Sequence, residues 1–327
     1  MKVLLTGASG FVGSHVLDVL CERGIQTSIL IRTSSNRRFI EPHSSRVEVR
    51  FGSLDDTRVL NAALQGVTHV VHCAGAVKAP KASEFHRINV GGTRWLVDAI
   101  NAHSDTVRRL IHVSSLAASG PGTASAPVRE SDPPRPVSVY GKSKLDSERV
   151  VSESCRVQYV IVRPPAVYGP RDAAFLALFK AVKRGWCPKF GSRFQELSLV
   201  YVRDLAEVVV SLLTHERAGG LTVNVACEEV VTDEELCRGI ADVLGVRLRR
   251  IAVPLWVLRL VCQVSDIASS ATGRASIIGL DKYRELTAPG WVCDTSVLRE
   301  KLGLVCPTRF AEGVRATAIW YQKQGWL

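Results

Sequence analysis

The sequence has no C-x-x-C pair, a single methionine and no long apolar run. Its nine cysteines are odd in number and widely spaced, which argues against a zinc site and against a secretory disulfide framework. Cysteines inside apolar runs behave as small buried hydrophobes, so we expect a reducing, cytoplasmic setting. The most apolar later stretch, residues 251–264, contains Pro254 and Arg259 and is too short to span a bilayer. We therefore expect no stable membrane insertion but an amphipathic helix packed on the protein, with a membrane-surface role as the alternative.

Basic runs interleaved with aromatic residues are also missing, although the net charge is +11. The basic residues are scattered, with short clusters at residues 37–38, 108–109 and 247–250. This distribution argues against a nucleic-acid partner and favours a mildly basic enzyme that handles anionic small molecules. A chain of 327 residues, 46% apolar and 22% charged, suits one large α/β domain or such a domain with a smaller appendage.

Short β-branched runs alternate with helical patterns through the first half of the chain. We expect strands at residues 3–6, 27–31, 47–51, 69–73, 110–114 and 159–162, and helices at 12–21, 57–64, 87–102 and 143–154. This alternation predicts a Rossmann-like, doubly wound parallel sheet covered on both faces. The sequence favours a nucleotide-binding domain over residues 1–165, which also receives the chain from about 198–230. A smaller, mostly helical substrate domain is expected over residues 166–327.

A glycine-rich turn, T-G-A-S-G-F-V-G at residues 6–13, follows the first expected strand. Gly7, Gly10 and Gly13 permit positive φ and close backbone approach, and the helix that follows offers free N–H groups to a pyrophosphate. The spacing is G-x-x-G-x-x-G rather than the commoner G-x-G-x-x-G. Its position between strand and helix still predicts a dinucleotide site.

The second strand ends at Arg32, where NAD-binding chains carry an acidic residue for the ribose 2′-hydroxyl. An arginine at this place suits the 2′-phosphate of NADP. Arg37 and Arg38 lie close by in the sequence. We therefore expect NADP(H) as the cofactor, with NAD(H) as the alternative.

A serine, a tyrosine and a lysine form the candidate chemical centre. Ser115 follows a predicted strand, and Tyr140 and Lys144 are four residues apart, which places them on one face of a helix. A nearby ammonium favours the phenolate, so the tyrosine can act as acid or base, while the serine hydroxyl polarises the same substrate oxygen. The stretch 117–136 between these residues predicts a substrate-facing loop.

Taken together, the segments TGASGFVGSHV, VVHCAGAV, NVGGTRWLVDA, HVSS, YGKSK, RPPAVYGP and YVRDLAEVV resemble the extended short-chain dehydrogenases/reductases, the NAD-dependent epimerase/dehydratase family. The resemblance covers nearly the whole chain. It implies catalytic roles for Ser115, Tyr140 and Lys144, a small-molecule substrate and a homodimer, and it makes Asn89 a structurally important residue near the site. The cofactor contacts that it implies are Gly7, Gly10, Phe11, Val12, Gly13, Arg32, Leu54, Cys73, Ala74, Gly75, Lys144 and residues 164–167, which include Pro164 and Val167.

Departures from the family patterns limit the reactions that we expect of this chain. Sugar dehydratases carry an Asp-Glu pair after the catalytic serine or threonine, whereas Leu116 and Ala117 stand here. Nucleotide-sugar epimerases often carry a phosphate-binding arginine where this chain has Leu197, although Arg193 is near. The sequence is closer to the dihydroflavonol reductase and hydroxysteroid dehydrogenase branches. We expect hydride transfer on a small, fairly apolar carbonyl or alcohol; the alternatives are a nucleotide-sugar epimerase or reductase and a non-catalytic NADP-binding regulator.

Overall fold

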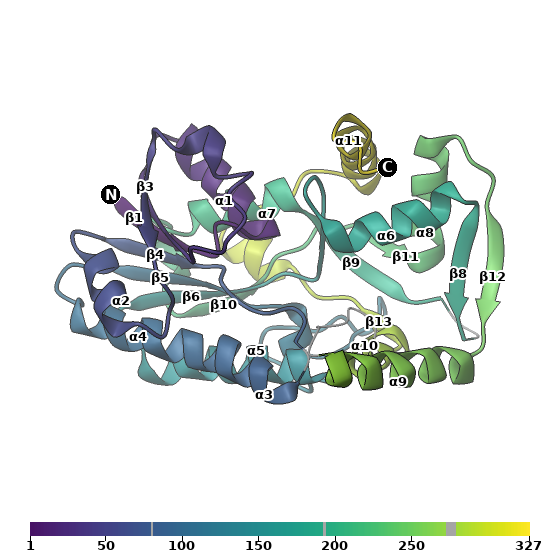
Figure 1. The fold of residues 1–327 in the computed structure, drawn as a ribbon, viewed down its shortest axis with the longest axis horizontal. Helices are drawn as coiled ribbons and strands as arrows, with labels where there is room; N and C mark the ends of the chain where they lie inside the picture. Colours follow the sequence, from purple (N-terminus) through teal and green to yellow (C-terminus); the bar gives the residue numbers. More distant parts are fainter. Residues whose placement is uncertain (80, 192–193, 273–278) are drawn as a thin grey trace.

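A computed structural model of the chain describes residues 1–79, 81–191, 194–272 and 279–327 (Figure 1). Its central feature is a seven-stranded sheet in which every pair of neighbouring strands is parallel. From one edge to the other its strands are β10 (Leu221–Asn224), β6 (Gln158–Arg163), β5 (Arg109–Val113), β4 (His69–His72), β1 (Lys2–Thr6), β2 (Gln26–Ile31) and β3 (Val47–Phe51). The predicted Rossmann-like fold is confirmed.

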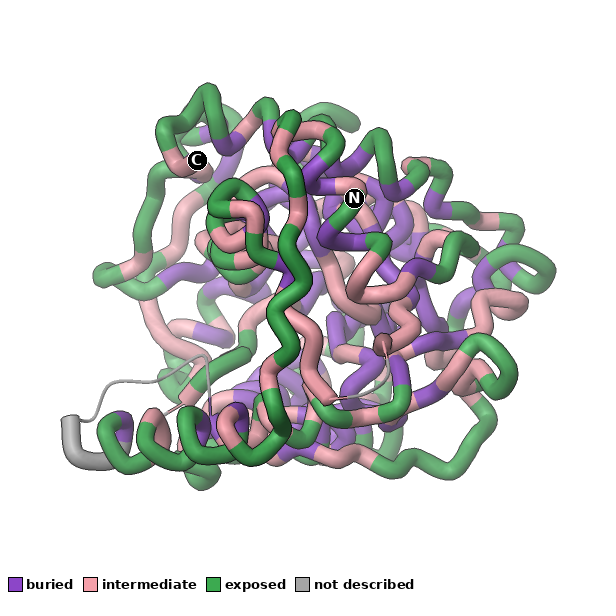
Figure 2. The backbone as a smooth tube through the Cα atoms, turned by 90° about the vertical axis from the view of Figure 1, so that its right-hand side faces the viewer, coloured by how far each residue is buried: buried purple, intermediate pink, exposed green. Residues whose placement is uncertain are grey.

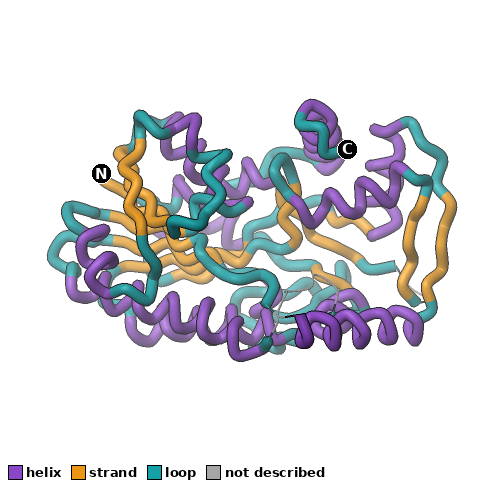
Figure 3. Tube along the Cα trace, viewed as in Figure 1, coloured by secondary structure: helices purple, strands orange, loops and turns teal. Residues whose placement is uncertain are grey.

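Helices cover both faces of this sheet, as the apolar strands require. One face packs against α1 (Phe11–Glu22) and α7 (Val202–Ser211) through a core that includes Leu17 and Leu205. The other face packs against α2 (Thr57–Leu64), α4 (Gly92–Ala102) and α5 (Val139–Ser154). Figure 3 shows the strands enclosed between these two helical layers.

A second group of elements follows β6 in the sequence and has a core of its own. Buried in that core are Tyr168, Phe179 and Tyr321. Its strands are β7 (Ala166–Tyr168), β8 (Trp186–Phe190), β9 (Glu196–Tyr201), β11 (Val230–Thr232), β12 (Arg249–Val253) and β13 (Gly290–Trp291). Its helices are α6 (Ala173–Lys183), α8 (Asp233–Leu244), α9 (Leu255–Thr272), α10 (Leu280–Leu286) and α11 (Phe310–Lys323).

Several predicted helices have different boundaries in the structure, and the one expected at residues 87–102 is a π-helical segment at His86–Gly91 followed by α4. The helix expected at residues 143–154 begins earlier, at Val139, because the Ser138 hydroxyl caps it by accepting a hydrogen bond from the Gly141 N–H at 3.0 Å. The apolar stretch 251–264 is divided at Pro254, so that its first residues belong to β12 and the rest to α9. Within the part of the chain that is described, none of the helices has both the length and the apolar content needed to cross a membrane.

The loop expected to face the substrate starts with a short 3₁₀ turn and then joins elements from the far end of the chain. Gly122 donates to the carbonyl oxygen of Gly290 at 3.1 Å, and Val128 donates to that of Val292 at 3.0 Å. The loop is therefore held at Gly122 and Val128 against β13 and the residue after it. This arrangement brings the carboxyl end of β5 and the C-terminal elements to the same region.

Candidate active site

The glycine turn lies between the carboxyl end of β1 and the start of α1. Gly7 has φ +79°, and a Cβ there would lie 2.6 Å from the backbone nitrogen of Ala74. A Cβ on Gly13 would lie 2.1 Å from the Gly7 carbonyl oxygen. Gly10 precedes α1 without a capping side chain, so the N–H groups of the first turn, at Phe11 and Val12, can face an anion. This geometry suits the pyrophosphate of a dinucleotide.

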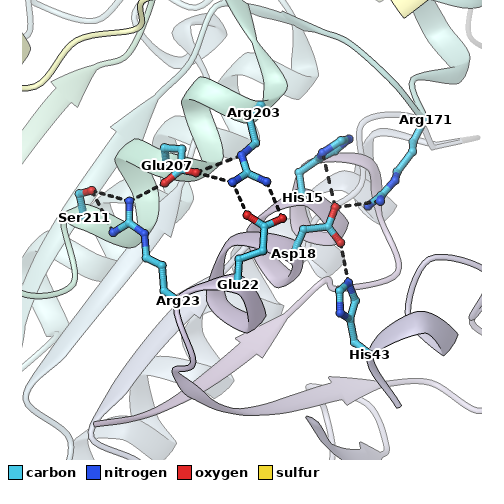
Figure 4. Close-up of polar contacts among 9 residues, drawn as sticks. All are labelled: His15, Asp18, Glu22, Arg23, His43, Arg171, Arg203, Glu207 and Ser211. Atoms are coloured by element: carbon cyan, nitrogen blue, oxygen red, sulfur yellow. Dashed lines mark hydrogen bonds and ion pairs between the residues drawn. The ribbon is translucent and has the colours of Figure 1, made fainter. Parts of the chain in front are cut away.

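The first helix is anchored on its outer side by a polar network, which Figure 4 shows. A ring nitrogen of His15 lies 2.9 Å from the Pro170 carbonyl oxygen, and Asp18 pairs with Arg171 at 2.8 Å and with His43 at 2.7 Å. Burial lowers the pKa of His15 to about 4, and the charge of Arg171 contributes to this lowering. His15 is therefore neutral at pH 7 while it joins α1 to the segment that follows β7.

Three arginines follow β2, and the structure separates them by their contacts. Arg32 is exposed directly after the strand, at a turn in which the Ser35 N–H donates to its carbonyl oxygen at 3.0 Å. Arg37 stacks on the Phe51 ring, with 4.7 Å between its guanidinium carbon and the ring centre. Arg38 instead donates to the Gln324 side chain of the C-terminal region at 2.6 Å. Arg32 is thus left exposed at the end of the strand, while Arg38 is engaged by the C-terminal region.

The loop after β4 brings Cys73, Ala74 and Gly75 next to the glycine turn. Buried Asn89 holds this loop, because its side chain accepts from the Ala76 N–H at 2.7 Å and donates to the Ala76 carbonyl oxygen at 3.1 Å. Burial raises the pKa of the Cys73 thiol to about 12, so that the thiol stays protonated. The structural importance expected of Asn89 fits these contacts.

The remaining candidates for cofactor contact lie at or shortly after the carboxyl ends of strands. Leu54 is half-buried after β3 and packs beside Gly92, at the start of α4. Pro164 is buried after β6 and accepts a hydrogen bond from the Leu116 N–H at 2.8 Å, while Val167 is half-buried in β7. Leu54 and Pro164 therefore follow the carboxyl ends of β3 and β6, where open α/β sheets bind ligands, and Val167 lies in the short strand that comes next.

Ser115 and Tyr140 belong to different elements, which the fold brings near one another. Ser115 follows β5, and Tyr140 is in the first turn of α5, half-buried beside the Phe85 ring. Burial raises the pKa of Tyr140 to about 12, the hydrogen bond with the Ser115 side chain opposes this rise, and the charge of Glu285 adds to it. The phenol is therefore protonated at pH 7 in the free protein and can donate to a substrate oxygen.

Lys144 lies one helical turn beyond Tyr140, and its side chain reaches inward to the sheet. Its ammonium donates to the Val113 carbonyl oxygen at 2.7 Å, at the end of β5. Burial lowers the pKa of Lys144 to about 8, while the carboxylate of Glu148 raises it. A Cβ built on Gly75 would lie 3.9 Å from this ammonium, so Lys144 connects the tyrosine helix with the loop after β4.

Glu148 continues the same helix face and was not among the residues singled out from the sequence. It forms a buried ion pair with Arg163 at 2.6 Å and accepts a hydrogen bond from the Ser114 hydroxyl. The pair fastens α5 to the ends of β5 and β6. The spacing of four residues from Tyr140 to Lys144 to Glu148 could have identified it, because such residues share one face.

Two acidic residues of α10 complete the surroundings of Tyr140. Asp281 accepts hydrogen bonds from the N–H groups of Val139, at 2.6 Å, and Tyr140, at 3.1 Å. Glu285 accepts one from the Ser138 hydroxyl at 2.9 Å. No local pattern signals these contacts, because the partners are more than 140 residues apart in the sequence.

At the two places where the sequence departs from the family patterns, the structure has buried or half-buried apolar residues. Leu116 and Ala117 are buried in the 3₁₀ turn after Ser115, so no carboxylate stands there. Leu197 is a half-buried residue of β9 that packs against the second core. Arg193, the nearby basic residue, lies outside the described residues.

Comparisons with known proteins agree with this arrangement. A model of the NAD dependent epimerase/dehydratase family matches residues 3–226. The ceramide reductase of Caulobacter vibrioides is 31% identical, over 99% of this chain and 96% of that protein. The UDP-glucose 4-epimerase of Vibrio cholerae is 28% identical, over 97% of this chain and 94% of that protein. The crystal structure of gox2253 has a TM-score of 0.82 at 26% identity and covers 100% of this chain and 99% of its own.

The matches extend over the glycine turn, the sheet and the elements that surround Tyr140. A relative above 30% identity that is covered almost end to end, together with the family model, identifies the protein as an enzyme of the extended short-chain dehydrogenase/reductase type. The chain belongs to the NAD-dependent epimerase/dehydratase family.

Proposed function

We propose that this enzyme transfers a hydride between NADP(H) and a carbonyl or alcohol of a small, apolar substrate. The observation that carries the proposal is the place of Tyr140 at the start of α5, one helical turn from the buried Lys144, whose ammonium donates to the Val113 carbonyl oxygen at 2.7 Å, two residues before Ser115. Lys144 lies beside the loop after β4, which adjoins the glycine turn. NADP(H), when bound, supplies or accepts the hydride; the protein supplies the proton and the orientation.

The protein's part in a carbonyl reduction is then to deliver one proton to the oxygen. Tyr140 donates this proton from its phenol, and Ser115 donates a second hydrogen bond that holds the same oxygen. Lys144 stabilises the phenolate that results and lies where it can also bind the ribose of the cofactor. In the oxidative direction Tyr140 accepts the alcohol proton instead. The raised pKa of Tyr140, about 12 in the free protein, favours the donor role.

Arg32 is the residue that supports NADP(H) over NAD(H). It is exposed immediately after β2, where the ribose of the adenosine half is bound in folds of this class. A guanidinium pairs well with a phosphate dianion, and no acidic side chain occupies its place. Arg37, fixed on Phe51, adds a second positive charge nearby.

An apolar carbonyl substrate is supported by what surrounds Ser115. Leu116 and Ala117 follow it, so the acidic pair that a dehydration would need is missing at this position. The relative from Caulobacter vibrioides is named a ceramide reductase, which is a reductase for a lipid. The likeness to the dihydroflavonol reductase and hydroxysteroid dehydrogenase branches points to the same substrate class.

A nucleotide-sugar epimerase is the second candidate, and the similarity to the UDP-glucose 4-epimerase of Vibrio cholerae favours it. An epimerase keeps its cofactor bound through the reaction and shows no net consumption of NADPH. Leu197, at the place of a phosphate-binding arginine, weighs against this candidate. Thermal-shift screening with NADPH present, across nucleotide sugars, aldehydes and lipid-like ketones, separates the two: stabilisation by nucleotide sugars alone would overturn the proposal.

The direct test is Tyr140→Phe, which removes the phenol and leaves the ring. We expect turnover with the best carbonyl substrate from the screen to fall by about a hundredfold or more, because proton transfer is lost. NADPH affinity, measured by its fluorescence, should change little. Tyr159→Phe on β6 serves as the matched control and should retain activity. Unchanged turnover in the Tyr140 variant would contradict the assignment.

A further inference from the structure

Helix α9 presents an apolar face to solvent. Four side chains spaced by four, four and three residues share this face, and they are among the most exposed large hydrophobics in the described chain: Trp256 (69%), Leu260 (52%), Val264 (58%) and Ile267 (70%). The opposite face holds Leu258 and Cys262, which are buried. The helix therefore packs on the protein by one apolar face and leaves a second one uncovered.

This concentration is unusual for the surface of a globular protein. Six of the fourteen large apolar side chains that are exposed in the described chain lie on α9, namely the four that share the face and, elsewhere on the helix, Leu255 and Val261. Surface helices ordinarily turn polar residues outward, and a contiguous exposed apolar patch marks an interaction site. Figure 2 shows the exposed run continuing from β12 into the start of α9.

The charges around this face are positive. Arg259 on α9 and Arg284 on α10 are both exposed. The carboxylates of the same two helices are engaged: Asp266 accepts from the Leu280 N–H at 2.9 Å, Asp281 caps α5, and Glu285 binds Lys282 at 2.9 Å. An apolar helix face with Arg259 beside it, a second exposed arginine on the neighbouring α10 and a tryptophan near its start has the make-up of a helix that lies in a membrane interface.

We propose that α9 docks this protein on the surface of an anionic lipid bilayer, with Trp256, Leu260, Val264 and Ile267 inserted among the acyl chains. Arg259 and Arg284 then meet lipid phosphates. A second copy of the chain suits this face less well. A symmetric contact would bring these arginines toward the same arginines of the other copy, and each chain carries a net charge of +11. An anionic lipid surface is complementary to both the apolar and the basic parts of the face.

A short series of hydrogen bonds connects α9 to the candidate active site. Asp266 of α9 binds the start of α10, and Asp281 of α10 binds the backbone of Tyr140. Figure 1 shows α9 and α10 next to the end of α5 that carries Tyr140. The inference rests on the proposed function in one respect: an apolar carbonyl substrate that resides in the bilayer would enter beside the helix that contacts it.

Vesicle co-sedimentation of the full chain tests the proposal. We expect binding to vesicles of equimolar phosphatidylcholine and phosphatidylglycerol, and weak binding to phosphatidylcholine alone. The triple variant Trp256→Gln/Leu260→Gln/Ile267→Gln should bind the mixed vesicles about tenfold or more weakly. Arg259→Gln and Arg284→Gln should each weaken binding about fivefold, and added salt should reduce the difference between the two vesicle types.

Matched controls separate the outcomes. Val305→Gln/Ile319→Gln removes exposed apolar side chains elsewhere, 59% and 44% exposed, and should bind vesicles like the unaltered chain. Melting temperature and NADPH affinity verify that the triple variant is folded. Absence of binding to the mixed vesicles, or equal binding by the triple variant, would overturn the proposal. A triple variant that turns from dimer to monomer while its vesicle binding is unchanged would assign the face to a second copy. Failure of the proposed function is distinct, since it appears as vesicle binding without NADPH-dependent turnover.

Discussion

The carboxylate of Asp281, on α10, lies 3.1 Å from the backbone nitrogen of Tyr140, on α5, and accepts its hydrogen bond. The N–H of Val139 donates to the same carboxylate at 2.6 Å. The first N–H groups of a helix have no partner within it, and a carboxylate there also meets the positive end of the helix dipole. A residue from the C-terminal half of the chain therefore holds the turn that carries the candidate proton donor.

Asp281→Ala should lower kcat by about tenfold to a hundredfold, because small displacements of a reacting group are costly. Its NADPH affinity should stay close to that of the unaltered enzyme, and the loss of the cap should cost about 1 kcal/mol of stability. Asp281→Asn keeps an acceptor oxygen and should restore part of kcat. The control is Asp146→Ala, on α5, whose carboxylate pairs with Lys142 and Arg149. An unchanged kcat in Asp281→Ala would show that Tyr140 is held without α10.

Glu285→Gln should shift the pH profile of alcohol oxidation toward lower pH. The negative charge of Glu285 raises the pKa of Tyr140, so its removal favours the phenolate that accepts the proton. The glutamine keeps an oxygen that can accept from the Ser138 hydroxyl. The measurement is kcat/KM against pH, with Glu312→Gln on α11 as the control. A profile that stays in place would argue that Tyr140 does not set the observed ionisation.

Arg32→Ser should weaken NADPH binding by about tenfold to a hundredfold and leave NADH binding nearly unchanged, because only NADPH carries the 2′-phosphate. Isothermal titration with both cofactors measures the difference. Arg38→Ser is the matched control, since the Arg38 guanidinium already donates to Gln324 at 2.6 Å. Equal losses for NADPH and NADH in the Arg32 variant would remove the basis for preferring NADP(H).

His15→Gln should reduce the loss of stability in acid. The pKa of His15 is lowered from its ordinary value of 6.5 to about 4 in the folded chain, so the unfolded chain binds more protons between these values. The free energy of unfolding therefore decreases as the pH falls through this window, by up to about 3 kcal/mol from this residue. Denaturant titrations at pH 7 and pH 4 measure it. The control is His86→Gln, at an exposed position, whose stability should depend on pH as that of the unaltered chain does. If the stability of His15→Gln also had the same pH dependence as that of the unaltered chain, the role given to His15 would be contradicted.

Gly13→Ala should impair both folding and cofactor binding. The new Cβ would lie 2.1 Å from the Gly7 carbonyl oxygen, so the turn between β1 and α1 must open. We expect a lower melting temperature and NADPH affinity reduced by about tenfold or more, because the N–H groups of α1 would be displaced. Gly24→Ala is a control for the general cost of substitution: its φ is +64°, but open space surrounds it. Normal NADPH affinity in Gly13→Ala would contradict the close approach.

Local patterns in the sequence determined the parallel sheet, the glycine turn and the placing of Tyr140 and Lys144 one turn apart on α5. These features depend on neighbours in the chain: apolar strands alternate with helices, glycines permit a tight turn, and residues four apart share a helix face. The start of α5 was predicted too late, because its cap at Ser138 has no apolar periodicity around it.

Only the tertiary structure decided which distant groups meet. The contact of Asp281 with Tyr140, the pair of Glu148 with Arg163 and the engagement of Arg38 by Gln324 join separate elements, and no spacing in the sequence encodes them. The same holds for α9, whose residues are apolar on both sides. Its composition predicts a helix that packs by an apolar face. The positions of β12 and α10 decide which of its faces meets the protein and which meets solvent.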